Sequence, residues 1–163
     1  MPASRRQPNP TVPAASRRSA PLRATAWVDG GARGNPGEAG CGVVLELNDG
    51  RREEHSLFIG VATNNVAEYA ALLAALERAA ALGVRELAVR ADSELLVRQM
   101  LGDYRVKARH LQPLWLRAQQ LARSLGRFAI AHVERGANRS ADRLANQAMD
   151  SRSSSLPRPQ GLP

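Results

Sequence analysis

The sequence predicts an α/β fold: a five-stranded mixed sheet, with three antiparallel strands followed by two parallel ones, and helices on both faces. Two observations support this prediction. Residues 24–59 contain three predicted strands with short links between them, which is typical of an antiparallel meander. From residue 63 onward, helical and strand-like patterns alternate, which favours parallel strands that are connected by helices.

The antiparallel part of the sheet is predicted from residues 24–59. The first strand is expected at residues 24–29, where an apolar run ends at Asp29. The Gly- and Pro-rich segment after it is expected to turn away from the sheet at once. A second apolar run covers residues 40–47, and Asn48-Asp49-Gly50 is a hairpin turn signal that leads into a third strand at residues 51–59.

Helices dominate the pattern that follows. Thr63 or Asn64 can cap a helix that strong helix formers, many of them alanine, extend to Gly83. A helix at this place is a crossover that can set the first and fourth strands side by side in parallel. The later elements are predicted as a strand at residues 84–91, a short helix from Asp92 and Ser93 to Met100, a loop at residues 102–107, a helix at residues 110–125, a strand at residues 127–134, and a helix that Ser140 caps and that ends near Met149.

The 163 residues suit one domain, which we expect at residues 24–150. Residues 1–23 and 151–163 are predicted to be disordered tails, because both are rich in proline, serine and arginine and contain no acid. Seven arginines in these ends account for most of the net charge of +8. Such basic arms either raise the affinity for polyanions or only keep the chain soluble.

The cysteine content and the apolar runs limit the class of protein. The single cysteine, Cys41, excludes an internal disulfide and a cysteine-rich zinc site, and it predicts a reducing, cytoplasmic compartment. No apolar run approaches the length of a membrane span, and the N-terminal arginines are not followed by the apolar region of a secretory signal. Nothing in the pattern indicates an oligomer, so we expect a monomer.

Four acids occupy positions with a shared meaning in this predicted topology. Asp29 and Asp92 each follow an apolar strand, and these two strands are expected to be parallel neighbours. Glu68 lies about one turn into the helix that precedes the fourth strand, and Asp142 lies in the first turn of the last helix. The four carboxylates are therefore expected to converge at one edge of the sheet.

Converging carboxylates repel one another, and a divalent cation relieves that repulsion. Hard ions such as Mg²⁺ or Mn²⁺ suit an all-oxygen cage that needs neither cysteine nor histidine. Two such ions about 4 Å apart can clamp the attacking water and the leaving oxygen of a phosphodiester. The acids thus predict a metal-dependent phosphodiester hydrolase.

Four sequence segments also carry a family resemblance. The chain resembles type 1 ribonuclease H over about residues 24–150, because these segments match the four family motifs in order and at fitting separations. They are Asp29-Gly-Gly-Ala-Arg-Gly-Asn-Pro-Gly37, Thr63-Asn-Asn-Val-Ala-Glu68, Ala91-Asp-Ser93 and Asn138-Arg-Ser-Ala-Asp142-Arg-Leu-Ala145. Each motif is weak alone, whereas the ordered set is highly specific.

The resemblance implies endonucleolytic hydrolysis of the RNA strand of an RNA–DNA hybrid by two metal ions, leaving 5′-phosphate and 3′-hydroxyl ends. By the family's pattern Asp29 would bridge both ions, Asp142 would join it at the ion that activates water, and Glu68 and Asp92 would complete the other. The ions would be Mg²⁺, for which Mn²⁺ can substitute.

The resemblance also implies residues that bind the hybrid. Asn35, Thr63 and Asn64 match family positions that contact substrate, and polar side chains of this kind can read 2′-hydroxyls and minor-groove base edges. A structural interpretation stands beside this one, in which Asn64 is only an N-cap and Asn35 only shapes the turn with Pro36. Tyr104-Arg-Val-Lys107 can contact phosphate or form a solvated loop.

Two departures place the chain with the compact branch of the family. Many relatives carry a histidine in the loop before the last aspartate, whereas residues 136–140 are short and have none. His132 is close in sequence, but it falls in a predicted strand, so the role does not transfer to it. Residues 102–110 are also too few for the basic protrusion with which many relatives grip the hybrid.

Two other functions fit the same fold. One is a nucleic-acid-binding module without catalysis, although such a module is free to lose acids and all four are present. The other is a related metal nuclease or integrase-like transferase. Two features argue against a related nuclease or transferase: the Thr63-Asn64 segment and the short loop before the last helix.

Overall fold

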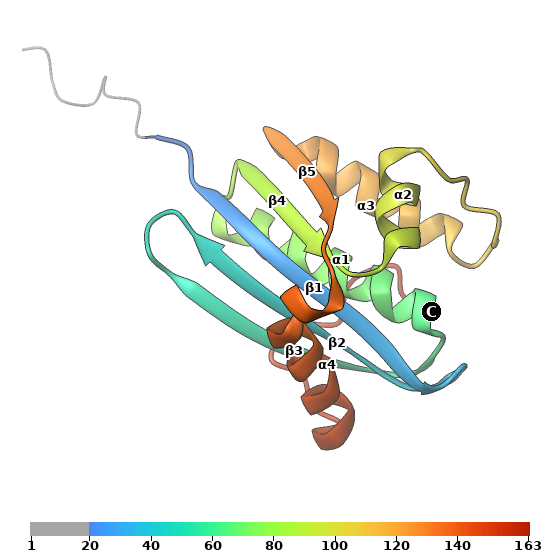
Figure 1. The fold of residues 1–163 in the computed structure, drawn as a ribbon. Coiled ribbons are helices and arrows are strands. Elements are labelled where there is room, and N and C mark those ends of the chain that lie inside the picture. Colours follow the sequence, from blue (N-terminus) through green and yellow to red (C-terminus); the bar gives the residue numbers. More distant parts are fainter. Residues whose placement is uncertain (1–19) are drawn as a thin grey trace, which may run out of the picture.

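The computed structural model describes residues 20–163, so most of the predicted N-terminal tail lies outside the described residues. The predicted order of elements is confirmed (Figure 1). The elements are β1 (Arg23–Gly34), β2 (Gly37–Leu47), β3 (Arg52–Ala62), α1 (Asn64–Leu82), β4 (Glu86–Ala91), α2 (Glu94–Leu101), α3 (Gln112–Ser124), β5 (Arg127–His132), the 3₁₀ turn η2 (Arg135–Ala137) and α4 (Arg139–Ser151).

The sheet is mixed, as the sequence predicts. Its strand order is β3-β2-β1-β4-β5, in which β1 pairs antiparallel with β2, β2 pairs antiparallel with β3, and the β1–β4 and β4–β5 pairs are parallel. Helix α1 packs on one face of the sheet, and α4 packs on the other face over β1, β2 and β3 (Figure 1). Among residues 20–163, no helix combines the length and the apolar composition that crossing a membrane requires.

Strand β1 is longer than the sequence predicts. The prediction that the chain turns away after Asp29 is wrong, because β1 continues to Gly34 and pairs with β2 as far as Gly37. Pairing with a neighbouring strand outweighs the low strand preference of the glycines. The parallel β1–β4 pairing, however, ends at Val28 and Ala91, so Asp29 still lies just beyond the end of that ladder.

Helix α1 follows its sequence signals at both ends. Thr63, rather than Asn64, is the N-cap, and its Oγ1 accepts a hydrogen bond from the Val66 amide at 3.2 Å. Gly83 ends the helix in the left-handed conformation at φ 79°. Because most of the alanines of α1 are buried, the helix lies close to the sheet and forms the centre of the core.

Two glycines let the helices approach the strands that carry the predicted site. A β-carbon at Gly30 would lie 2.2 Å from the carbonyl oxygen of Ala67 in α1. A β-carbon at Gly42 would lie 2.1 Å from the carbonyl oxygen of Ala141 in α4. Contact of backbone against backbone on both faces thus sets the distance between the sheet and the helices that bear Glu68 and Asp142.

The residues after α4 differ from the disordered tail that composition predicts at 151–163. Ser151 still belongs to α4, and residues 153–163, which we call the strap, run along β3 and then onto α1. Leu156 and Leu162 pack against the core, and Pro159 is buried. Serine hydroxyls and a few apolar side chains give this segment partners that its composition does not reveal.

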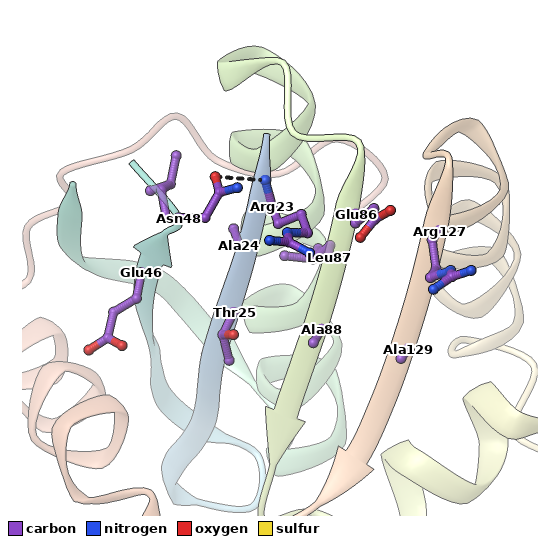
Figure 2. A pocket seen from close by; sticks show the side chains of 11 residues that line it. Arg23, Ala24, Thr25, Glu46, Asn48, Glu86, Leu87, Ala88, Arg127 and Ala129 are labelled. Atoms are coloured by element: carbon purple, nitrogen blue, oxygen red, sulfur yellow. Dashed lines mark hydrogen bonds between the residues drawn. The ribbon is translucent and has the colours of Figure 1, made fainter. Parts of the chain in front are cut away.

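The α4 side of the sheet is only half covered. Figure 2 shows a cavity of about 450 Å³ on the uncovered half, where small side chains from three strands, Thr25, Ala88 and Ala129, lie beside one another. Its charged residues, Arg23, Glu46, Glu86 and Arg127, include both signs. This cavity contains none of the four predicted site acids.

An ion pair ties β3 to α1 and should make stability depend on pH. The Arg78 guanidinium bonds both oxygens of Glu53, at 2.7 and 3.0 Å. This pair, together with His55, lowers the pKa of Glu53 from 4.5 to about 2. Stabilisation by the ionised form is therefore complete above about pH 4.5 and is lost as the pH falls towards 2.

We expect Arg78→Gln to lower the free energy of unfolding by about 1–2 kcal/mol at pH 7, a range for a partly screened bidentate pair. The difference from the native chain should shrink as the pH falls below about 4.5. Urea unfolding of both chains at pH 7 and at pH 3 measures this difference in the free energy of unfolding. Arg98→Gln removes an exposed pair with Glu94 in α2 and is the control, with a loss below about 0.5 kcal/mol. An equal loss at both pH values in Arg78→Gln would contradict the expectation.

Candidate metal centre

Two of the four acids lie on adjacent parallel strands. Val28 of β1 pairs with Ala91 of β4; Asp29 is the next residue of β1, and Asp92 is the first residue after β4. Asp29 is 8% exposed, and its Oδ1 accepts a hydrogen bond from the Gly30 amide at 3.0 Å. The end of the parallel ladder therefore sets these two carboxylates side by side.

The other two acids come from the helices on opposite faces of the sheet. Glu68 lies in the second turn of α1, which Gly30 allows to approach β1 closely. Asp142 lies in the first turn of α4, where Asn138 precedes the helix and donates from Nδ2 to the Val28 carbonyl at 2.9 Å. This buried bond fixes the start of α4 beside Asp29.

The structure brings the four acids together. One carboxylate oxygen from each of Asp29, Glu68 and Asp92 lies within 4.8 Å of the others. Asp142 is more exposed, and it approaches Asp29 closely enough to raise the pKa of Asp29. All four line a single open cavity of about 450 Å³.

The electrostatics of this cluster is that of crowded carboxylates that no described basic side chain pairs with directly. Burial, followed by the charge of Asp92 and the contact with Asp142, raises the pKa of Asp29 to about 8. Burial and the charges of Asp29 and Asp92 raise the pKa of Glu68 to about 9. Among residues 20–163, none of the four acids forms a salt bridge.

An orphaned oxygen indicates what the cluster can hold. Glu68 Oε2 is buried and has no hydrogen-bond partner. A buried acceptor of this kind is costly unless a donor or a cation reaches it. Since the surrounding ligands are all carboxylate oxygens, the donor set fits a hard divalent cation such as Mg²⁺ or Mn²⁺.

The three predicted substrate-binding residues lie where the β1–β2 hairpin meets the start of α1, and they hold the local structure. Asn64 Oδ1 accepts from the Ala32 amide at 2.8 Å, and Asn35 Oδ1 accepts from the Asn64 amide at 3.1 Å. Together with the Thr63 cap, these bonds attach the β1–β2 hairpin to the start of α1. Of the three, Asn64 lines the acidic cavity.

Sequence reasoning missed three polar residues of the cavity. Arg33, Arg135 and Asn146 line it together with the acids. Arg135 comes from η2, in the loop before α4, and no motif marks it.

His132 is exposed on β5 and does not line the cavity. The Tyr104–Lys107 loop borders a different cavity of about 810 Å³ with Trp115, so it lies apart from the acids.

Comparison with protein families and known structures gives consistent matches. Residues 27–148 match the family described as Reverse transcriptase-like. The chain is 49% identical over 124 residues to a bifunctional protein of Mycobacterium tuberculosis, covering 75% of this chain and 34% of that protein. It is 43% identical over 129 residues to ribonuclease HI of Halobacterium salinarum, covering 78% of this chain and 65% of the relative. The chain thus spans about a third of the first of these relatives and under two thirds of the second.

Solved structures agree with these matches. The crystal structure of RNase H1 from Halobacterium salinarum superposes with a TM-score of 0.76 at 43% identity, covering 79% of this chain and 98% of that one. LC11-RNase H1, solved in complex with an RNA/DNA hybrid, superposes with a TM-score of 0.74 at 41% identity, covering 79% of this chain and 98% of that one.

Proposed function

Since this chain belongs to the type 1 ribonuclease H family, we propose that it is an endonuclease that hydrolyses the RNA strand of RNA–DNA hybrids and leaves 5′-phosphate and 3′-hydroxyl ends. The observation that supports this most strongly is the convergence of Asp29, Glu68 and Asp92 within 4.8 Å, with Asp142 beside them in one open cavity. A module that only binds nucleic acid has no use for such a costly cluster.

The four acids would hold two Mg²⁺ ions, with Mn²⁺ as a substitute. When bound, the ions supply activation of the attacking water and stabilisation of the leaving oxygen in an in-line displacement. Asp29 would be the central ligand, since it lies near both the Glu68–Asp92 side and the Asp142 side of the cluster. One Glu68 oxygen is buried, whereas Asp142 is exposed. The set of ligands would therefore extend from the interior of the protein to the solvent.

Polar groups around the acids would position the hybrid. Asn35, Thr63 and Asn64 lie where the β1–β2 hairpin meets α1, and an amide or hydroxyl group there can contact the 2′-hydroxyl that distinguishes RNA from DNA. Arg135 lines the cavity and can offer its guanidinium group to phosphate oxygens, whereas the Arg33 guanidinium pairs with Asp150 at 2.6 Å. Through such local contacts a folded part with little net charge can bind a polyanion.

The activity is expected to be selective among duplexes. With Mg²⁺ or Mn²⁺ present, labelled RNA–DNA hybrid should be cut in its RNA strand, and RNA–RNA and DNA–DNA duplexes of the same sequence should be cut far more slowly. Gel analysis of end-labelled strands shows which strand is cut and which ends remain, and a chelator is the control. Binding of the hybrid without turnover under either metal would favour the non-catalytic module, and cleavage of DNA–DNA duplex would favour the related nuclease or transferase.

Three further features complete the proposal. Residues 24–150 would carry the ribonuclease H domain, with the basic residues 1–23 as an arm that adds affinity for nucleic acid or keeps the chain soluble. The single buried cysteine, Cys41, suits a cytoplasmic compartment. The working state would be a monomer.

A further inference from the structure

Strand β3 lies at one edge of the sheet and is 11 residues long. An edge of this length has a row of unpaired N–H and C=O groups, which is a template for pairing with another strand. The opposite edge strand, β5, has only 6 residues. The β3 edge is therefore the longer of the two edges that need protection from strand pairing, and the strap covers its middle.

Two serines of the strap bond the outward-facing backbone groups at the middle of β3. The Ser155 amide donates to the Ser56 carbonyl at 2.9 Å, and the Ser56 amide donates to Ser155 Oγ at 3.1 Å. Ser154 Oγ accepts from the Phe58 amide at 3.0 Å and donates to the Phe58 carbonyl at 3.3 Å. The strap thus satisfies both the donor and the acceptor of each residue, as an added strand would.

The strap is attached beyond these serines as well. Arg158 Nη1 donates to the Ile59 carbonyl at 2.9 Å, and the Gln160 amide donates to Glu77 Oε1 of α1 at 3.1 Å. Pro159 is buried between these two contacts. Most of these bonds use side chains on one partner, so the strap covers the edge without forming a regular ladder.

We propose that the outer edge of β3 is a strand-addition site, which the strap occupies in the same chain, and that the alternative occupant is β3 of a second copy. An antiparallel register centred on Leu57 would pair Ser56 with Phe58 of the second copy, which satisfies the same four backbone groups. This register is regular over Ser56–Phe58, because the pairing of β3 with β2 shifts between Phe58 and Gly60, and no charged side chains oppose each other within it.

The full chain with Ser154→Ala and Ser155→Ala tests this proposal. We expect amide hydrogen exchange at Ser56 and Phe58 to rise by about tenfold, since each loses a hydrogen bond worth about that factor. Sedimentation velocity should then show a dimer whose share grows with concentration, and a synthetic peptide of residues 152–163 should return it to monomer. The control is Ser153→Ala, because the Ser153 hydroxyl pairs with that of Ser151 instead of with β3.

Two results would overturn the proposal. Unchanged exchange at Ser56 and Phe58 in the double variant would show that the strap does not protect the edge. Faster exchange in a variant that stays monomeric at every soluble concentration would exclude the second copy as occupant. Both readouts are independent of nuclease activity, because the strap contacts none of the four acids.

Discussion

Asp29→Asn is expected to reduce cleavage of the RNA strand by about 10³-fold or more, which is typical when a group that stabilises developing charge is removed. Asp29 lies at the centre of the acid cluster, so its loss weakens the ligand set on both sides. The change keeps the shape of the side chain, and the remaining carbonyl oxygen can still accept from the Gly30 amide. Single-turnover cleavage of labelled hybrid measures the effect.

Thermal unfolding separates loss of the site from loss of the fold. Asp29→Asn removes one negative charge from mutually repelling carboxylates, so its Tm without metal should equal or exceed that of the native chain. The rise in Tm that Mg²⁺ gives the native chain should shrink in the variant. Asp103→Asn, an exposed acid outside the cavity, is the matched control and should change neither property. Native turnover in Asp29→Asn would remove the basis for the proposed function.

Gly42→Ala is expected to damage the site without touching any acid. The added β-carbon would lie 2.1 Å from the Ala141 carbonyl oxygen and 2.7 Å from Leu144 Cβ, so α4 must move away from β2. Overpacking of this kind costs about 1–3 kcal/mol. Asp142 follows Ala141 directly, and a displacement of about 1 Å lowers turnover by up to about 100-fold.

Urea unfolding and cleavage rate together test the Gly42 prediction. The control is Gly136→Ala, since a β-carbon at Gly136 meets no atom within 4 Å. We expect the control to keep the stability and the turnover of the native chain. A Gly42→Ala variant with native stability and native turnover would show that the spacing between α4 and the sheet does not position Asp142.

Much of the fold could be predicted because local signals and topology agree. Thr63 and Gly83 mark the two ends of α1, and the structure places the helix between them. A crossover helix before the fourth strand implies that β1 and β4 are parallel neighbours, which they are. Adjacent placement of Asp29 and Asp92 follows from that single rule.

The errors arose where a distant partner decides the local conformation. Glycine has a low strand preference, yet β1 extends to Gly34 because β2 supplies the opposite half of the ladder. Ser140 was predicted to cap the last helix, whereas α4 begins at Arg139 and the Asn138 side chain bonds the Val28 carbonyl instead of its own helix. Neither partner can be identified from the residues around it.

The same reason explains what was missed at the site and at the end of the chain. Arg135 reaches the acidic cavity only because η2 folds over the end of the sheet, and no local pattern marks it. Ser154 and Ser155 read as tail residues by composition, but β3 gives their hydroxyl groups bonding partners. The metal-binding role of the acids is a prediction that Asp29→Asn tests.

The acidic centre draws on β1, α1, β4 and α4, which include the first strand and the last helix of the fold. A nascent chain on the ribosome therefore lacks one of the four carboxylates until Asp142 has been added and α4 has docked. Under the proposed function, a shorter translation intermediate lacks the complete site, which forms only when α4 has packed on β1 and β2.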